Sequence, residues 1–386
     1  MKNIYLLGST GSIGRQVLEI VDLYPDEFKI ICLSSHKRMK DLMYLIGKYK
    51  PEFVSVNTKN EADAFSDLFP EVIFGYGKTG LIHAATFKPK DNAGVLINAL
   101  VGISGLHPTV EAIKIKRNIL LANKETLVVG GVLIKQLLAE YKVSLYPIDS
   151  EHSAIWQCLV GEKIEEVQKV IITASGGAFR DYSLEQLASV TKKEALNHPN
   201  WTMGDKITID SATMMNKGFE VIEAAYLFDL GIDQIDTIIH KESIIHSLVE
   251  FKDHSIKAQL SSHDMRLPIQ YAMFYPNRKP SLTESIQLSQ IGNLNFEKMN
   301  EEKYPCFTYA KQAFIQGGSM PCVLNAANEA AVQLFLDDLI PFLEIPLIIA
   351  HQIESHKVIT SPTLEELLAL DEQIKQDVYS LWKVKE

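Results

Sequence analysis

Residues 1–150 alternate short apolar runs with helical stretches, and this alternation constrains the fold more than any other feature of the chain. Strands that alternate with helices form βαβ units, and such units build a parallel sheet. The predicted strands are residues 4–7, 30–33, 53–56, 94–98, 118–121 and 144–148, and the helices between them include residues 13–23 and 39–48. The sequence therefore predicts an α/β fold.

A glycine-rich loop, Gly8-Ser-Thr-Gly-Ser-Ile-Gly14, connects the first predicted strand to the first predicted helix. In this position backbone N–H groups and a helix N-terminus suit a pyrophosphate. The Gly-x-x-Gly-x-x-Gly spacing is a variant of the dinucleotide-binding pattern. A glycine turn that serves only helix–sheet packing is the alternative. We favour a Rossmann-like nucleotide-binding domain.

The residues after the second predicted strand indicate which dinucleotide is bound. Proteins that bind NAD usually place Asp or Glu there to hold the ribose hydroxyl. Here the strand runs into Ser34-Ser-His-Lys-Arg38, which contains no acid. Lys37 and Arg38 suit a 2′-phosphate, so the segment favours NADPH, although a solvated basic turn explains each side chain about as well.

Two carboxylates follow the predicted strand 144–148, in Asp149-Ser-Glu151. Ligands bind at the carboxyl ends of parallel strands, and alternate residues of extended backbone point the same way. Together with Glu220 they would offer three hard oxygen ligands, which suit Mg²⁺ or Mn²⁺ rather than zinc. The alternative is that Asp149 or Ser150 caps the helix predicted over residues 152–159.

The segment Asp210-Ser-Ala-Thr-Met-Met-Asn-Lys-Gly-Phe-Glu220 combines phosphate-binding and metal-binding side chains. Beyond Met214 the pattern predicts a helix, on which Asn216 and Glu220 share a face with Lys217 alongside. Ser211, Asn216 and Lys217 provide donors for a phosphate. Glu220 provides a ligand for a hard metal ion.

Three further polar segments are candidates for the same site. Ser175-Gly-Gly177 follows a strand predicted over residues 170–174 and would expose N–H groups to an anion, although turn geometry explains it equally well. Residues 197–204 place Trp201 in a polar loop broken by proline, which favours a water-excluding lid over an ordinary anchored loop. Asn123-Lys-Glu125 follows the strand 118–121, where Lys124 would meet substrate and its neighbours the nicotinamide ribose. A helix N-terminal glutamate is the alternative there.

The histidines outside these segments are less informative. His246 fits a buried core histidine as well as a site residue, and His83 and His107 are interpreted as structural.

The rest of the chain is organised differently from residues 1–150. Residues 151–275 mix helices with strands, which include residues 237–239 and 256–260. Residues 275–305 show little periodicity and resemble a surface linker. From residue 308 the apolar spacing is helical, most clearly over 323–335 and 364–381, and predicts a small helical bundle.

Composition limits the partners of this 386-residue chain. Its net charge of −10 argues against nucleic acid or an anionic membrane as a partner, and it requires local donors for any anionic substrate. No apolar run reaches the ~18 residues of a transmembrane helix. Four cysteines without Cys-x-x-Cys spacing indicate a reducing compartment, and with no signal segment before the first strand we expect a cytoplasmic protein.

Five of these segments together resemble one family, the 1-deoxy-D-xylulose-5-phosphate reductoisomerases of the non-mevalonate isoprenoid pathway. They are Leu7–Gly14, Leu121–Glu125, Asp149–His152, His198–Gly204 and Asp210–Gly218, in the family's order and spacing. The resemblance covers essentially the whole chain, and Asp210–Gly218 is its most specific part. It implies a homodimer with an NADPH-binding domain (1–150), a catalytic domain (151–277) with a lid near 196–205, a linker (278–307) and a C-terminal helical bundle (308–386).

The resemblance also implies a role for each matching position. The metal ligands would be Asp149, Glu151 and Glu220. The substrate would be bound by Lys124, Ser150, Glu151, Ser175, His198, Ser211, Asn216, Lys217 and Glu220. NADPH would be bound by Thr10, Gly11, Ser12, Ile13, His36, Lys37, Arg38, Asn123, Glu125 and Gly204. The residues that take part directly in catalysis would be Lys124, Glu151, His198 and Lys217.

Three positions depart from the family pattern. The family often has Gly or Ala where this chain has His36, and Asn where it has Arg38, so the contacts to the 2′-phosphate stay open. Ala174 stands where Gly is common, which is a minor change.

Such an enzyme would convert 1-deoxy-D-xylulose 5-phosphate, a small phosphorylated sugar, to 2-C-methyl-D-erythritol 4-phosphate. A bound Mg²⁺ or Mn²⁺ polarises the ketone, NADPH supplies hydride, and phosphate binding supplies energy to close the lid. A semialdehyde or homoserine-type dehydrogenase shares the domain plan. A semialdehyde dehydrogenase needs a thiolate, for which the apolar surroundings of Cys158 are poor. A non-catalytic NADPH-binding regulator would not need three convergent carboxylates.

Overall fold

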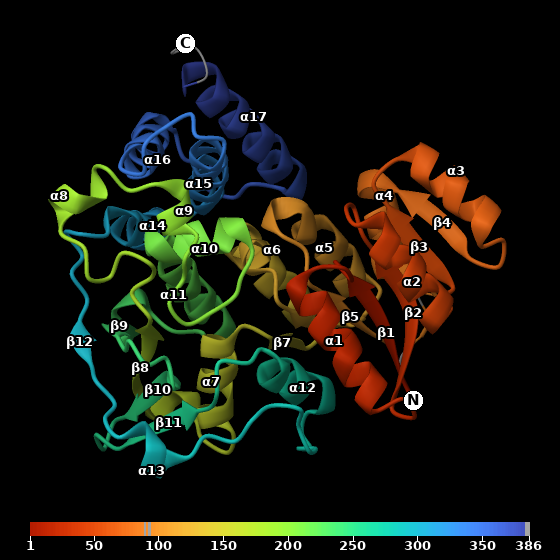
Figure 1. Ribbon diagram of the computed structural model, residues 1–386, viewed down its shortest axis with the longest axis horizontal. Coiled ribbons are helices and arrows are strands. Elements are labelled where there is room, and N and C mark those ends of the chain that lie inside the picture. Colours follow the sequence, from red (N-terminus) through yellow and green to blue (C-terminus); the bar gives the residue numbers. More distant parts are fainter. Residues whose placement is uncertain (89, 92–93, 383–386) are drawn as a thin grey trace. The chain divides into compact units, whose positions relative to one another are not determined.

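A computed structural model describes residues 1–88, 90–91 and 94–382, which form two compact units (Figure 1). The first unit comprises Met1–Thr126, Val132–Asp149 and Asp264–Thr283. The second comprises Leu127–Gly131, Ser150–His263 and the chain from Glu284 onwards. The chain therefore passes from the first unit to the second between Asp149 and Ser150, within the predicted metal-binding segment.

The first unit is built on a parallel sheet whose described strands lie in the order β4-β3-β2-β1-β5-β6-β7. The strands are β1 Lys2–Leu7, β2 Phe28–Ser34, β3 Phe53–Val56, β4 Ile73–Tyr76, β5 Gly94–Asn98, β6 Asn118–Leu121 and β7 Leu145–Pro147. All residues of β3 and β5 are buried, as expected for strands covered on both faces. The predicted α/β fold with a Rossmann-like sheet is confirmed.

Helices connect these strands. They are α1 Ser12–Leu23, α2 Met39–Tyr49, α3 Lys59–Leu68, α4 Gly77–Thr86, α5 Leu106–Lys114 and α6 Lys124–Tyr141, and α12 Arg266–Phe274 packs beside α1. Strand β4 was not predicted. It lies at the sheet edge and none of its residues is buried, so it lacks the apolar run that marks the central strands.

The second unit contains a mixed sheet in the order β11-β10-β8-β9-β12. Its strands are β8 Val167–Ala174, β9 Ile235–Ile239, β10 Ile245–Phe251, β11 Ile256–Leu260 and β12 Glu297–Lys298. Strands β8 and β9 are parallel, and the other pairs are antiparallel. Strand β10 was not predicted, although its residues alternate between buried and half-buried at its C-terminal end.

Two helices of the second unit, α7 Ser150–Leu159 and α11 Met215–Phe228, share one apolar core with this sheet. Ile155 and Cys158 of α7 and Val221 of α11 pack in the same cluster as Val170 and Val249 of the strands. Burying these side chains fixes the backbones of both helices, and their N-terminal turns carry the predicted ligands. The helices α8 Leu184–Leu187, α9 Lys192–Ala195 and α10 Asp205–Ala212 lie between β8 and α11 in the chain.

The C-terminal part is helical, as predicted, and is drawn in blue in Figure 1. Its helices are α14 Pro305–Gln316, α15 Met320–Leu336, α16 Glu344–Ser355 and α17 Leu364–Trp382. Between residues 275 and 305 the structure has the short helix α13 Leu288–Ile291 and β12. The predicted domain boundaries stay predictions, and residues 383–386 of the predicted bundle lie outside the described residues.

Gly14 marks where α1 packs closely on the loop that precedes it. A Cβ atom added to Gly14 would lie 2.3 Å from the backbone oxygen of Gly8 and 2.7 Å from Cα of Ser9. We therefore expect Gly14→Ala to lower the free energy of unfolding by about 1–3 kcal/mol, as overpacking does. The control is Gly47→Ala in α2, where a Cβ meets nothing within 4 Å and a gain of about 0.5–1 kcal/mol is expected. Urea denaturation measures both, and equal stability of the two variants would contradict this packing.

Candidate metal and substrate site

The first helical turn of α7 carries the acidic part of the site. Asp149 directly precedes α7, and Ser150 and Glu151 are its first two residues. The hydroxyl of Ser150 donates to Oε2 of Glu151 at 2.6 Å. Lys124, at the start of α6, places its ammonium 2.8 Å from Oδ2 of Asp149. These four predicted residues therefore form two polar contacts at the end of the strand β7.

The N-terminal turns of α11 carry the basic and amide part of the site. Nδ2 of Asn216 donates to Oε1 of Glu220 at 2.5 Å, so the predicted shared helix face is confirmed. Nζ of Lys217 donates to Oε1 of Glu151 at 2.9 Å and also to Glu220. Burial alone would lower the pKa of Lys217, but the carboxylates of Glu151 and Glu220 raise it above its ordinary value. Lys217 is therefore a buried ammonium that joins two carboxylates.

Asp149, Glu151 and Glu220 form a candidate metal centre. One carboxylate oxygen from each lies within 4.8 Å of the others. Three carboxylates this close repel one another unless cations lie among them, and an all-oxygen donor set suits Mg²⁺. The donor chemistry and spacing therefore fit the predicted ion, with the ammonium of Lys217 already bonded to two of its three ligands.

A second polar group joins the turn after β8 to the loop predicted as a lid. Nε2 of His198 lies 3.1 Å from the hydroxyl oxygen of Ser175. Nδ1 of His198 accepts the backbone N–H groups of Asn200 at 3.1 Å and Trp201 at 3.0 Å. Since Nδ1 accepts two hydrogen bonds, the ring proton sits on Nε2 and can be donated to Ser175. His198 thus connects Ser175, a predicted substrate residue, to the backbone N–H of Trp201.

Trp201 packs against two histidines. Its ring centroid lies 6.2 Å from that of His246 and 5.5 Å from that of His263. His246 is buried, and burial lowers its pKa, so it is neutral and packs as an aromatic side chain. His246 is therefore a buried histidine that packs against Trp201 of the predicted lid, and its role as a site residue stays a prediction.

Ser211 belongs to α10, a helix that the sequence pattern did not predict. A Cβ atom added to Gly177 would lie 2.5 Å from the backbone oxygen of Ser211, so the turn after β8 approaches the end of α10 closely. Asp210 is 2% exposed and accepts a hydrogen bond from Nδ2 of Asn328 on α15 at 2.8 Å. The predicted phosphate residues Ser175 and Ser211 are therefore held by neighbouring backbone segments.

The predicted nucleotide residues lie in the first unit, apart from Gly204, which is the N-cap of α10. The hydroxyl groups of Thr10 and Ser35 are 2.6 Å apart, and Nη1 of Arg38 donates to the backbone oxygen of Thr10 at 3.0 Å. Arg38 therefore lies against the glycine-rich loop that contains Gly11, Ser12 and Ile13. Next to it, burial lowers the pKa of His36, which favours a neutral ring.

Asn123 has a clear structural role at the start of α6. Its side-chain oxygen accepts the N–H of Thr126 at 3.1 Å. Its Nδ2 donates to the backbone oxygens of Leu100 and Gly102 and to Glu125. Asn123 is 1% exposed, so in this structure its amide caps the helix and orients Glu125.

Four residues of the site were not singled out from the sequence. Arg180 donates from Nη1 to the backbone oxygen of Ser175 at 3.2 Å and to Oδ1 of Asn200 at 3.4 Å, so it contacts the same turn and the same predicted lid loop as His198. The others are His263 beside Trp201, and His152 and Glu223 beside the carboxylates. The position of His152 directly after Glu151 and the three-residue spacing of Glu223 from Glu220 were the available signals.

The fold and site together define a class. A Rossmann-like sheet with a glycine-rich loop, combined with an oxygen-rich metal centre beside phosphate donors, is typical of a metal-dependent oxidoreductase that uses a nicotinamide dinucleotide. Within the described residues, no helix is both long enough and apolar enough to reach across a membrane.

Three family models match successive parts of the chain. They are 1-deoxy-D-xylulose 5-phosphate reductoisomerase at residues 4–131, the C-terminal domain of that reductoisomerase at 145–228 and the DXP reductoisomerase C-terminal domain at 260–377. The chain is 49% identical over 381 residues to 1-deoxy-D-xylulose 5-phosphate reductoisomerase of Macrococcus caseolyticus (strain JCSC5402), covering 99% of this chain and 100% of the relative. It is also 49% identical over 372 residues to 1-deoxy-D-xylulose 5-phosphate reductoisomerase 2 of Bacillus anthracis, covering 96% and 97%.

Solved structures give the same result. A DOX-P reductoisomerase in complex with NADPH, fosmidomycin and magnesium matches with a TM-score of 0.94 and 35% identity, covering 100% of this chain and 99% of that chain. The 1-deoxy-D-xylulose 5-phosphate reductoisomerase of Zymomonas mobilis in complex with NADPH matches with a TM-score of 0.91 and 35% identity, covering 99% of each chain. This chain belongs to the 1-deoxy-D-xylulose 5-phosphate reductoisomerase family.

The contacts of His198 predict a pH dependence. Burial, reinforced by Arg180 and His263, lowers the pKa of His198 to about 4. Because an unfolded histidine has a pKa of about 6.5, the unfolded chain binds more protons between these values. The stability that His198 contributes is therefore complete above about pH 6.5 and is lost as the pH falls toward 4.

We expect ¹⁵N NMR spectra to show His198 as the neutral Nε2–H tautomer from pH 8 down to pH 5. Assignment by comparison with His198→Asn identifies its signals. A titration midpoint between pH 6 and pH 7 would contradict the burial and hydrogen bonding described for this ring.

Proposed function

We propose that this protein catalyses the metal-dependent isomerisation and NADPH-dependent reduction of 1-deoxy-D-xylulose 5-phosphate to 2-C-methyl-D-erythritol 4-phosphate, in the non-mevalonate pathway to isoprenoids. The observation that carries this proposal is the cluster of Asp149, Glu151 and Glu220 beside the donors Asn216 and Lys217. The reductoisomerase that shares this fold at a TM-score of 0.94 binds NADPH, fosmidomycin and magnesium.

Asp149, Glu151 and Glu220 would hold the divalent cation, which we assign as Mg²⁺ with Mn²⁺ as a substitute of similar ligand preference. When bound, the ion supplies Lewis-acid chemistry to the carbonyl and hydroxyl oxygens of the substrate. The chain's own contribution is to keep three carboxylates close together in a largely buried place. Lys124, bonded to Asp149, and Ser150, bonded to Glu151, would present donors to the keto-diol end of the same substrate.

The phosphate of the substrate would be bound at the other end of the site. Ser175, Ser211, Asn216 and Lys217 carry the donors, and His198 orients Ser175 through its Nε2 proton. Holding the phosphate away from the reacting carbons supplies binding energy that can be used to orient them. Trp201 and its loop would then cover the substrate and exclude water from it.

NADPH would bind across the glycine-rich loop of the first unit, where Thr10, Gly11, Ser12 and Ile13 lead into α1. Lys37 and Arg38 supply positive charge for the 2′-phosphate, with His36 as a neutral neighbour. Glu125 and Gly204 complete the proposed cofactor contacts, and Asn123 would act by holding Glu125. Lys124, Glu151, His198 and Lys217 are the side chains that we propose act directly in catalysis.

We also propose a cytoplasmic homodimer. Support for a reducing compartment comes from Cys32, Cys158, Cys306 and Cys322, whose thiols are free and buried. Burial raises the pKa of Cys158 to about 11, which does not favour the thiolate that a semialdehyde dehydrogenase requires. The dimer follows from the family resemblance, and sedimentation velocity tests it directly.

Lys217 gives a prediction about metal affinity, because its ammonium is bonded to two of the proposed ligands. Removing that ammonium takes one positive charge away from the carboxylates of Glu151 and Glu220, so a divalent cation is attracted more strongly. We expect Lys217→Met to bind Mn²⁺ more tightly than the wild type while its KM for the sugar phosphate rises. Calorimetric titration of Mn²⁺ and steady-state kinetics measure the two effects. Weaker Mn²⁺ binding would refute the proposal that Lys217 offsets the charge of the metal ligands.

The activity itself is tested by NADPH oxidation with 1-deoxy-D-xylulose 5-phosphate. We expect turnover that stops in EDTA and returns with Mg²⁺. Glu220→Gln should lower kcat by a factor of 100 or more, on the order expected when a metal ligand is lost, while NADPH still binds. The matched control is Glu365→Gln, on the exposed surface of α17, which should keep wild-type kcat. Turnover that continues in EDTA would refute the metal assignment, and no turnover with this sugar phosphate would refute the proposed function.

A further inference from the structure

A fully buried histidine joins the two helices that carry the carboxylate cluster. His152 is the third residue of α7 and is 0% exposed. Its Nε2 atom lies 2.8 Å from the backbone oxygen of Glu220 on α11. Because a carbonyl oxygen can only accept, Nε2 carries the proton and donates it. The ring therefore fastens α7 to the backbone of a proposed metal ligand.

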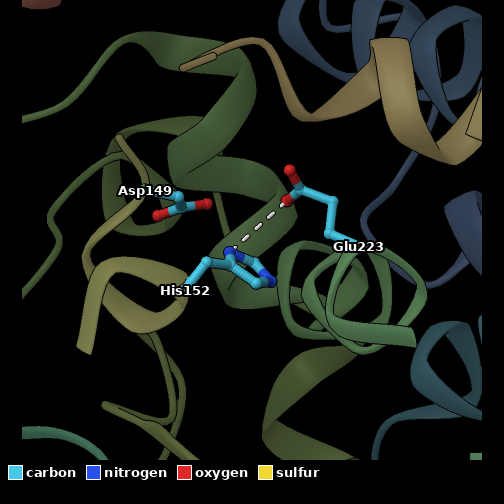
Figure 2. A group of neighbouring side chains, drawn as sticks. All are labelled: Asp149, His152 and Glu223. Atoms are coloured by element: carbon cyan, nitrogen blue, oxygen red, sulfur yellow. Dashed lines mark ion pairs between the residues drawn. The ribbon is translucent and has the colours of Figure 1, made fainter. Parts of the chain in front are cut away.

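The other ring nitrogen of His152 faces a second glutamate of α11 (Figure 2). Nδ1 lies 3.8 Å from Oε2 of Glu223, whose side chain is 4% exposed. Glu220 and Glu223 are three residues apart on α11, so both lie toward α7. Helix α11 thus contacts the ring at both nitrogens, and one ligand atom from each of Asp149, His152 and Glu223 lies within 4.8 Å of the others.

The contact between His152 and Glu220 matters because His152 directly follows Glu151 on α7. Glu151 provides a carboxylate to the metal centre, and the next residue, His152, binds the backbone of Glu220. A single pair of adjacent residues therefore supplies one ligand and fixes the position of another that lies 68 residues further along the chain. Ligand carboxylates must be held within about 0.5 Å of their productive geometry, and residues behind the ligands do this.

We propose that His152, through the hydrogen bond of its Nε2 to the backbone oxygen of Glu220, is a positioning residue that sets the separation of the Glu151 and Glu220 carboxylates. The inference rests on the proposed function, because it assumes that these carboxylates bind a divalent cation. A purely structural role for His152 would lower the free energy of unfolding and leave the metal affinity of the folded protein unchanged.

The test compares the Mn²⁺ affinity of folded variants without substrate, measured by the EPR signal of free Mn²⁺. His152→Leu keeps an apolar volume but has no donor for the Glu220 carbonyl. We expect it to bind Mn²⁺ about 10–100-fold more weakly, which is the typical effect of losing a residue that supports a metal ligand. NADPH affinity, measured by fluorescence, should not change. His152→Gln keeps an N–H donor at similar reach and should recover most of the affinity.

The control is His356→Leu, directly after α16, which removes a half-buried histidine whose Nε2 lies 2.8 Å from the hydroxyl of Ser319. It should bind Mn²⁺ as the wild type does. Wild-type Mn²⁺ affinity in folded His152→Leu, or a loss in His152→Gln as large as in His152→Leu, would overturn the proposal. If His152→Leu does not fold, His152→Phe, which also lacks a donor for the Glu220 carbonyl, replaces it. Weaker Mn²⁺ binding is expected, and wild-type Mn²⁺ binding would contradict the proposal.

Mn²⁺ binding by the wild-type protein distinguishes a failure of this inference from a failure of the proposed function. Wild-type protein that binds no Mn²⁺ at all, or whose Mn²⁺ binding is unaffected by Glu220→Gln, refutes the metal centre itself. Wild-type protein that binds Mn²⁺ through Glu220 while His152→Leu binds it equally well refutes only the positioning role.

Discussion

Charge compensation within a partly buried group of carboxylates is the interaction on which the rest of the site depends. Asp149, Glu151 and Glu220 come within 4.8 Å of one another, and the ammonium groups of Lys124 and Lys217 lie against them. Removing one partner of such a buried pair typically costs about 3–5 kcal/mol, because a charge is left uncompensated. Three carboxylate oxygens this close together also attract a divalent cation, whose charge would offset their mutual repulsion.

The fold provides the rigid support that this arrangement needs. Helix α7 begins where β7 ends, and it shares an apolar core with α11 and the mixed sheet of the second unit. The acidic first turn of α7 and the polar first turns of α11 are thereby held together, although they are far apart in the sequence. The proposed substrate donors lie near other ends of regular structure, such as Ser175 after β8 and Ser211 in α10.

Much of the fold and part of the site followed from local pattern. Period and spacing identified the central strands of the parallel sheet, the glycine-rich loop and the shared face of Asn216 and Glu220. Strand β4 was not predicted because an exposed edge strand lacks the apolar run of a central strand. Helix α10 was not predicted because it has few apolar residues and its burial depends on tertiary contacts, such as the hydrogen bond between Asp210 and Asn328.

Contacts between distant segments could not be predicted in the same way. The sequence suggested Lys217 as a phosphate donor, but only the packed structure shows its ammonium between Glu151 and Glu220. Likewise, Arg180 and His152 act through backbone oxygens of other segments, and a backbone oxygen has no signature in the sequence. Residue type revealed which chemistry was available, whereas tertiary packing decided which groups met.

We propose that the three carboxylates form one divalent-metal site. The most direct measurement is an anomalous difference map from crystals grown with Mn²⁺. We expect a single strong peak bonded to carboxylate oxygens of Asp149, Glu151 and Glu220, at about the 2.0–2.2 Å typical of small divalent ions bound by oxygen. A map with no peak among these three residues, or with the ion bound by other side chains, would contradict it.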